Sequence, residues 1–295
     1  MTHSKLKAGA SGTAYHHKWW ILAAIGVSLF MSSIDGTIVN VALPTLTRDL
    51  STDFATIQWV VLSYLLGLAV LMLSMGRLGD MVGKKGVFTI GLIVFVLGSV
   101  LCGLAPDVYW LIAFRFVQSI GAAMMMALGV AIVTETWPAR ERGMAIGISG
   151  GIISLGIVAG PVLGGLILQY LDWRWIFFVN VPIGIAALIL VWRFVPKLKP
   201  KETDERFDFA GALLVGLGLL TISLSMTSIQ LYGLASPQAL GLLGISVLSL
   251  AAFVWVERTV RSPMIDLSLL TNSYMSSALF TGFLTFVAIA AVVLV

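Results

Sequence analysis

Long apolar stretches separated by short polar segments dominate the hydropathy pattern of this chain. Each stretch reaches the ~20 residues that an α-helix needs to cross the hydrocarbon core of a bilayer. The pattern therefore predicts an all-α, multi-pass membrane protein with nine transmembrane helices. The expected spans are 19–43, 57–76, 86–105, 109–132, 143–169, 175–194, 209–230, 237–256 and 274–295.

The one long hydrophilic segment, from Pro196 to Asp208, separates the first six spans from the rest. Val295 lies inside an apolar run, so the sequence is expected to be the front part of a longer protein. The expected divisions are a cytoplasmic tail at 1–18, an N-terminal six-helix transmembrane bundle at 19–194, a cytoplasmic linker at 195–208, two additional transmembrane helices at 209–256, and a cytoplasmic loop with the first helix of a truncated C-terminal bundle at 257–295.

Composition and charge agree with this topology. Charged residues make up 11% of the chain, whereas a soluble domain carries about 25%. Most of the 18 lysines and arginines fall on one side of the membrane if the N-terminus is cytoplasmic. The sequence therefore predicts a protein of the cell (inner) membrane with a cytoplasmic N-terminus. The positive net charge reports topology and gives no support to a nucleic-acid partner.

Two charged residues lie inside the spans and away from their cytoplasmic ends. Asp35 is near the middle of the first span, where a carboxylate costs roughly 2.5–3.5 kcal/mol on insertion scales. Small and polar residues follow it as far as Pro44, which is typical of a wetted helix face. Arg115 in the fourth span has two interpretations: its side chain reaches the headgroups, or it faces a polar cavity. We expect Asp35 to line a pathway that requires a titratable group.

A glycine-rich loop is expected after the second span, at 76–85. Asp80 there can cap the next helix or pair with a base, and on physical grounds alone the segment is equally well an ordinary positive-inside turn. In the fifth span Gly156, Gly160 and Gly164 recur every four residues, so they form one stripe that permits close helix contact. Pro161 interrupts the helical hydrogen bonding. The alternative for this stripe is a general packing seam.

These segments resemble sequence motifs of the major facilitator superfamily. The loop resembles G-x-L-a-D-r-x-G-r-k, and the resemblance implies a conformational latch. Met81 departs from the motif because a base is usual there, so the pairing would fall to Arg77 or Lys84, with Glu135 as the candidate acid. The remaining matches in this loop are Gly76, Leu78, Asp80, Gly83, Lys84 and Lys85.

Two more motifs lie in the fourth and fifth spans. The fifth resembles G-x-x-x-G-P-x-x-G-G, which in this superfamily marks antiporters and implies a sealed helix pair. The fourth resembles R-x-x-Q-G-x-G-A-A, with Ser119 in place of a glycine, and implies proton transfer. The matching residues are Gly156, Gly160, Pro161, Gly164 and Gly165 in the fifth span, and Arg115 and Gln118 in the fourth.

The segment from Asp35 to Pro44 resembles the first-helix motif of the 14-helix drug:proton antiporters of the EmrB/QacA type. Tyr64, Asn180 and Gly184 are further matches. The resemblance implies a major facilitator helical bundle that exports amphipathic, drug-like compounds by alternating access. It assigns proton coupling or substrate contact to Asp35, Asn40, Arg115 and Gln118. It implies the proton gradient as the energy source, with no cofactor.

Other functions stay open at this stage. The same scaffold would serve export of a dedicated metabolite, lipid or siderophore, and a different class altogether is a non-transporting membrane fragment or partner. The sequence contains no cysteine–histidine metal spacing, phosphate-binding glycine loop or hydrolase motif, so neither a metal site nor an enzyme is expected. The expected partners are small amphipathic substrates, protons and the lipid bilayer, with a periplasmic adaptor protein as a further candidate.

Overall fold

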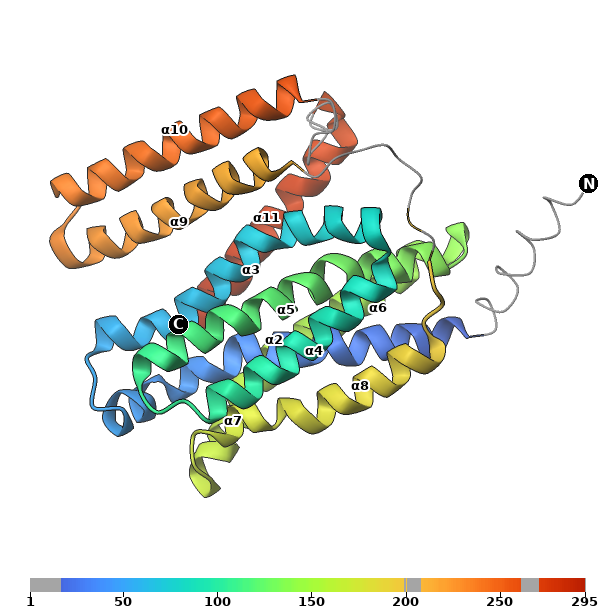
Figure 1. The fold of residues 1–295 in the computed structure, drawn as a ribbon, viewed down its shortest axis with the longest axis horizontal. Coiled ribbons are helices and arrows are strands. Elements are labelled where there is room, and N and C mark those ends of the chain that lie inside the picture. Colours follow the sequence, from blue (N-terminus) through green and yellow to red (C-terminus); the bar gives the residue numbers. More distant parts are fainter. Residues whose placement is uncertain (1–16, 199, 201–207, 261–270, 295) are drawn as a thin grey trace, which may run out of the picture. The chain divides into compact units, whose positions relative to one another are not determined.

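The computed structural model describes residues 17–198, 200, 208–260 and 271–294. These residues form helices and turns, without a β-strand, which confirms the all-α fold class (Figure 1). The helices are α2 (Lys18–Asp49), α3 (Phe54–Val82), α4 (Lys84–Gly103), α5 (Val108–Thr136), the 3-10 turn η1 (Ala139–Glu141), α6 (Arg142–Tyr170), α7 (Trp175–Phe178), α8 (Asn180–Phe194), α9 (Phe209–Tyr232), α10 (Pro237–Thr259) and α11 (Ser273–Leu294).

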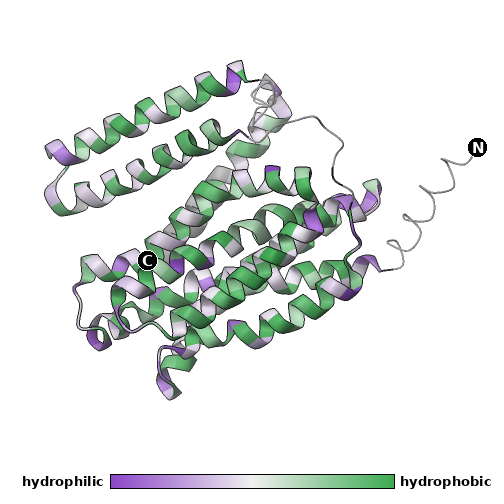
Figure 2. Cartoon of the chain, in the orientation of Figure 1, coloured by the Kyte–Doolittle hydropathy of each residue, from purple (hydrophilic) through white to green (hydrophobic). Residues whose placement is uncertain are grey.

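Eight helical segments of the described residues are long and apolar enough to cross a membrane, with η1–α6 and α7–α8 each counted once. They correspond to the first eight expected spans. The ninth expected span, 274–295, coincides with α11, and only Val295 of that span is outside the described residues. Hydrophobic residues run along the helices, and hydrophilic residues gather mainly at their ends (Figure 2). The chain is a multi-pass membrane protein.

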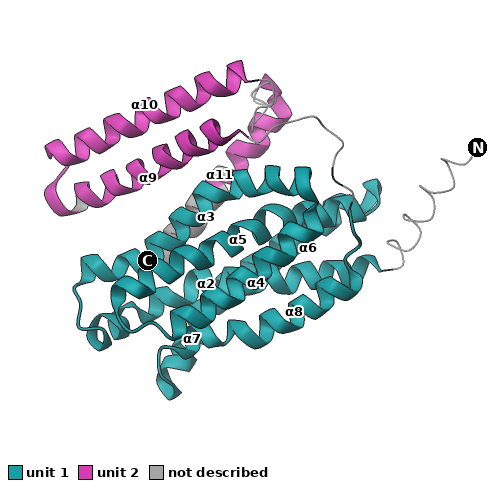
Figure 3. Ribbon diagram, in the orientation of Figure 1, with its two compact units in different colours: residues 1–204 teal, residues 205–295 magenta. Residues whose placement is uncertain are grey.

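The chain divides into two compact units, Met1–Asp204 and Glu205–Val295 (Figure 3). In the first unit α2 packs against α3, α5, α6 and α8. The buried apolar residues of α2 belong to two clusters. One contains residues from Ile21 to Met31, and the other contains residues from Ile34 to Leu46. Asp35 therefore lies on α2 where the two apolar clusters meet.

Helix ends explain where the spans differ from expectation. Asp53 begins α3 because its carboxylate accepts from the backbone N–H of Thr56 at 2.9 Å, which is N-capping. The helix then continues to Val82, through residues 76–81 that were expected to form a loop. The reversal is confined to Gly83, whose φ of 114° is a conformation that favours glycine. The expected loop was wrong because glycines inside an otherwise helical segment do not by themselves end the helix.

In the second unit α9 and α10 pack against each other. Serine hydroxyls of α10 donate to backbone carbonyls of α9, from Ser246 to Gly218 at 2.9 Å and from Ser249 to Leu214 at 3.1 Å. Small polar residues of this kind join helices in lipid without introducing charge.

Candidate functional site

A buried ion pair joins α2 to α5. Arg115 Nη1 donates to Asp35 Oδ2 at 2.6 Å, and neither side chain has any solvent exposure. Two opposite charges attract far more strongly in a protein interior than in water. Each also compensates the other for its lost hydration, so removing either partner leaves an uncompensated buried charge.

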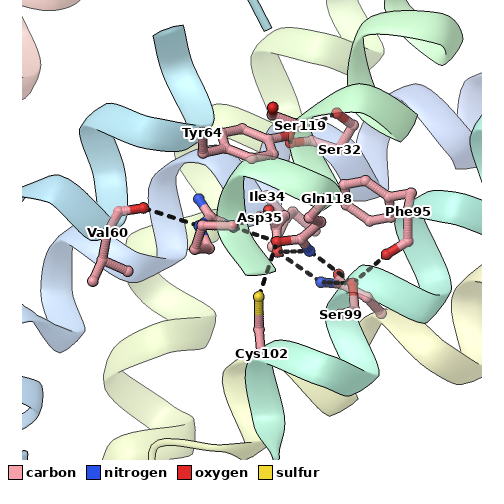
Figure 4. A network of polar contacts seen from close by, with 12 residues as sticks. Ser32, Ile34, Asp35, Val60, Tyr64, Phe95, Ser99, Cys102, Gln118 and Ser119 are labelled. Atoms are coloured by element: carbon pink, nitrogen blue, oxygen red, sulfur yellow. Dashed lines mark hydrogen bonds and ion pairs between the residues drawn. The ribbon is translucent and has the colours of Figure 1, made fainter. Parts of the chain in front are cut away.

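The other carboxylate oxygen of Asp35 accepts two amide hydrogen bonds. Gln118 Nε2 of α5 lies 3.0 Å from Oδ1, and Asn180 Nδ2 of α8 lies 2.8 Å from it. Both amides also donate to Ser99 Oγ of α4, at 2.7 and 3.3 Å. Figure 4 shows Gln118 and Ser99 beside Asp35. The ionised carboxylate is thus held by side chains of two other helices and linked through them to a third.

Arg115 is fixed on its other sides as well. Its Nε donates to the backbone carbonyl of Val60 at 3.1 Å, and its guanidinium carbon lies 4.1 Å from the centroid of the Tyr64 ring. The Tyr64 hydroxyl in turn donates to the carbonyl of Ser32 at 3.2 Å. A cation over an aromatic face is attracted by the ring, and the attraction grows when water is excluded. Helices α2, α3, α4, α5 and α8 therefore all contribute to one polar network, which we call the Asp35 network.

The structure brings Asp35, Arg115 and Gln118 together but leaves Asn40 outside this network. Asn40 is exposed and lies five residues after Asp35 on the same helix, about 140° around it. The amide that contacts Asp35 is Asn180, 145 residues further along the chain. Asn180 was noticed in the sequence only as a motif match, and Ser99 was not singled out. The available signal for both was a polar side chain within an apolar span.

A second charged cluster lies at the ends of α3 and α5 and the start of α4. Lys84 Nζ contacts Asp80 Oδ1 at 2.8 Å and Glu135 Oε2 at 2.9 Å. Lys84, one of the two bases expected for this role, thus pairs with Glu135. Gly76, Arg77 and Asp80 belong to the last turns of α3, and Gly83 is the turn residue. We call Asp80, Lys84 and Glu135 the Lys84 cluster.

Lys85 binds a different helix from Lys84. Its Nζ donates to the carbonyl oxygens of Trp192, at 3.2 Å, and Val195, at the C-terminal end of α8. These carbonyls have no partner further along the helix, and a cation there also interacts favourably with the helix dipole. Two adjacent lysines therefore connect α4 to α3, α5 and α8 at one end of the first unit.

The glycine stripe of α6 packs on α2, the helix that carries Asp35. A Cβ atom added at Gly156 would lie 2.9 Å from the carbonyl oxygen of Phe30, and at Gly160 or Gly164 it would lie 3.1 Å from the carbonyl oxygen of Ile34 or Ile38. These distances leave no room for a larger residue. Gly165 lies outside this contact, with no neighbour within 4 Å of such a Cβ atom. Pro161 is inside the helix, next to Gly160.

Across the residues that the structure describes, no three His, Cys, Asp or Glu side chains come close enough to hold a metal ion.

Comparison with known proteins gives one family. The model of the Major Facilitator Superfamily matches residues 25–295. The riboflavin transporter RibZ of Clostridioides difficile is 42% identical over 209 residues, covering 71% of this chain and 46% of that protein. The multidrug resistance protein Stp of Mycobacterium tuberculosis (strain H37Rv) is 38% identical over 269 residues, covering 91% and 50%. The puromycin resistance protein pur8 of Streptomyces alboniger is 36% identical over 249 residues, covering 84% and 49%.

The chain spans about half the length of these curated relatives. Among solved structures, a bacterial homolog of the human lysosomal transporter Spinster, in an inward-facing and occupied conformation, is similar in fold. It is 19% identical, with a TM-score of 0.50, and the match covers 86% of this chain and 64% of that one.

Proposed function

This chain belongs to the Major Facilitator Superfamily, and on that premise we propose that it is the front part of a proton-coupled antiporter for amphipathic, drug-like compounds. Relatives named for multidrug and puromycin resistance support export of such compounds. Because the chain spans about half of those relatives, the proposal concerns the whole protein.

The observation that carries the proposal is the buried pair of Asp35 and Arg115. A proton bound to Asp35 removes one of two charges that are held 2.6 Å apart without solvent. The attraction between Asp35 of α2 and Arg115 of α5 then weakens. The relative stability of two arrangements of these helices therefore depends on whether Asp35 is protonated. A ligand, here a proton, shifts a conformational equilibrium only through such a difference between the two states.

Two further features support a rocking mechanism of alternating access. The α2–α6 seam at Gly156, Gly160 and Gly164 would keep these helices packed together while one bundle moves against another. The Lys84 cluster joins three helices at one end of the unit and would act as a latch that favours one conformation. Positive charge at that end supports a cytoplasmic N-terminus in the cell (inner) membrane.

Transport of a fluorescent dye into inverted vesicles, which corresponds to efflux from the cell, tests the proposal under an imposed pH gradient. We expect the native gene product to transport, Asp35→Asn to lose gradient-driven efflux while still inserting, and Asp35→Glu to keep a measurable part. Asp172→Asn is the matched control, because this acid lies in an exposed pair with Arg174. Gradient-driven efflux at the wild-type rate in Asp35→Asn would remove Asp35 from the mechanism.

The relative named as a riboflavin transporter, at 42% identity, favours a second candidate, which is transport of one dedicated metabolite. The two candidates differ in selectivity. Competition between riboflavin and a panel of unrelated cationic drugs in the same vesicles separates them, because a dedicated transporter responds to one compound only.

A further inference from the structure

Asn180 is the first residue of α8, which continues from α7 through Val179 as one membrane crossing, Trp175–Phe194. Its side chain is buried. Within the described part of the chain, both of its side-chain hydrogen bonds leave from Nδ2, toward Asp35 Oδ1 at 2.8 Å and Ser99 Oγ at 3.3 Å. The amide thus contacts Asp35, the group proposed to carry the proton.

The other amide of the network, Gln118, is held at both ends. Its Oε1 accepts from Arg115 Nη1 at 2.7 Å, and its Nε2 donates to Ser99 at 2.7 Å and to Asp35 at 3.0 Å. A rotation that exchanged its two ends would turn N–H donors toward a guanidinium, which has only donors itself. Gln118 therefore keeps one orientation whatever the charge on Asp35.

Protonation of Asp35 changes the hydrogen-bond donors and acceptors that its surroundings must provide. The proton goes to Oδ1, because Oδ2 faces Arg115. An ionised carboxylate only accepts hydrogen bonds, whereas the protonated oxygen donates one. Both amides present N–H donors to Oδ1 in this structure, so the new O–H has no acceptor among them. Of the two described amides that contact this oxygen, Asn180 can supply an acceptor by rotating so that its own Oδ1 replaces Nδ2.

We propose that Asn180 is an amide switch that follows the charge of Asp35. Its Nδ2 donates to the ionised carboxylate, and its Oδ1 accepts from the protonated one. The proton moves from water to Asp35, and no covalent bond of Asn180 changes. This inference rests on the proposed proton coupling and assigns Asn180 as a positioning residue within it.

Other ionisable groups around Asp35 stay in one charge state in this scheme. In the described residues they are Arg115 on α5, Tyr64 on α3 and Cys102 on α4, whose thiol donates to Gln118 Oε1 at 3.7 Å. From α8 the network receives the Asn180 amide and no charge. The switch therefore needs only one titrating group.

Replacement by leucine, which has a similar shape and no amide, tests the switch. A hydrogen bond to an ionised group is stronger than one to a neutral group, so its loss favours protonated Asp35. We expect Asn180→Leu to raise the pH midpoint of gradient-driven efflux by about one unit. Ser28→Ala is the control, because this buried hydroxyl on α2 bonds only to Ala24 of its own helix, and its midpoint should not move.

Infrared difference spectra between low and high pH provide a second readout in the purified, full-length protein. The wild type should show a carboxyl band that Asp35→Asn lacks, together with a side-chain amide band that Asn180→Leu lacks. An unchanged midpoint in a folded Asn180→Leu, or a wild-type spectrum with the carboxyl band and no amide band, overturns the switch. Absence of the carboxyl band and of gradient-driven efflux in the wild type would instead overturn the proposed function.

Discussion

The Asp35 network and the Lys84 cluster contain the same chemistry in different surroundings. In each, a carboxylate and a base join helices that are distant in sequence. Asp35 and Arg115 have no exposure, whereas the side chains of Lys84, Asp80 and Glu135 are 10, 31 and 42% exposed. Water weakens and salt screens the charges of the second group but not those of the first.

Under the proposed function, this difference in exposure would suit the two groups to different tasks. A proton at the dry pair changes its interactions by much more than thermal energy, so it can select a conformation. The wet cluster exchanges protein contacts for water at little cost, so it can open and close without a change of protonation. The first is suited to coupling, and the second is suited to a latch.

The largest effect is expected from breaking the buried ion pair of Asp35 and Arg115. Arg115→Ala leaves Asp35 buried without its cation, which costs about 3–5 kcal/mol of stability. Thermal unfolding of the purified protein should show this loss, and gradient-driven efflux should disappear.

A neutral pair sharpens this test. In the double variant Asp35→Asn/Arg115→Gln neither position of the pair carries a charge, so most of the stability should return while proton-driven efflux does not. If the double variant transports at the wild-type rate, the dry pair has a structural role only.

A smaller loss of stability is expected from substitutions in the glycine stripe of α6 that packs on α2. Gly160→Leu forces a branched side chain against the backbone of Ile34, and overpacking of this kind costs about 1–3 kcal/mol. Efflux should fall strongly. Gly165→Leu is the matched control on the same helix, since its position is open.

Gly26→Leu should lie between these two variants. The first atom that its Cβ would meet is the end of the Ile152 side chain, at 2.8 Å, and such an atom moves aside more easily than backbone does. Equal loss of efflux in the variants at positions 160 and 165 would show that the seam is not specific.

Substitutions in the Lys84 cluster should change the stability of the protein weakly and the rate of transport clearly. Asp80→Asn removes one of the two acids that bind Lys84, which costs up to about 1 kcal/mol for a partly exposed pair. Turnover should slow more than substrate binding weakens, because the cluster makes no contact with substrate in a latch role. Glu135→Gln should act in the same direction. A tenfold fall in affinity with unchanged turnover would contradict this role.

The smallest effect is expected where an acid is exposed and only caps a helix. Hydrogen bonds from Thr56 hold the pKa of the Asp53 carboxyl below its usual value. Its contribution to the start of α3 is therefore present above pH ~4 and is lost as the pH falls through the lowered pKa. Asp53→Ala should increase hydrogen exchange in the first turn of α3 at neutral pH, and should differ little from wild type at pH 2.

The helices and the charges inside them follow from local patterns and could be predicted from sequence. Hydropathy located the first eight spans because a bilayer sets a minimum apolar length for each crossing. The end of the second span was misjudged, because whether a helix continues through Gly76 and Gly79 depends on neighbours, here Ala127 and Leu128 of α5.

Partners across the bundle were harder to predict. Asn40 is near Asp35 in sequence, but helical geometry turns it away, whereas Asn180 reaches the same carboxylate from 145 residues later. Such a contact is decided by how α8 packs on α2, and hydropathy contains no information about that packing. The pairing of Lys84 with Glu135 could be predicted from the sequence, because the motif left few candidate bases for Glu135.

The order of the chain also has a consequence for biogenesis. Asp35 lies on the first helix of the bundle, and its partners are synthesised 80 residues later for Arg115 and 145 residues later for Asn180. At 5–20 residues per second the nascent carboxylate waits roughly 4–30 s for them. Alone in a bilayer it would cost roughly 2.5–3.5 kcal/mol during that time. The first helix must therefore wait as a neutral acid, or remain against the insertion machinery of the cell until the fourth and sixth crossings arrive.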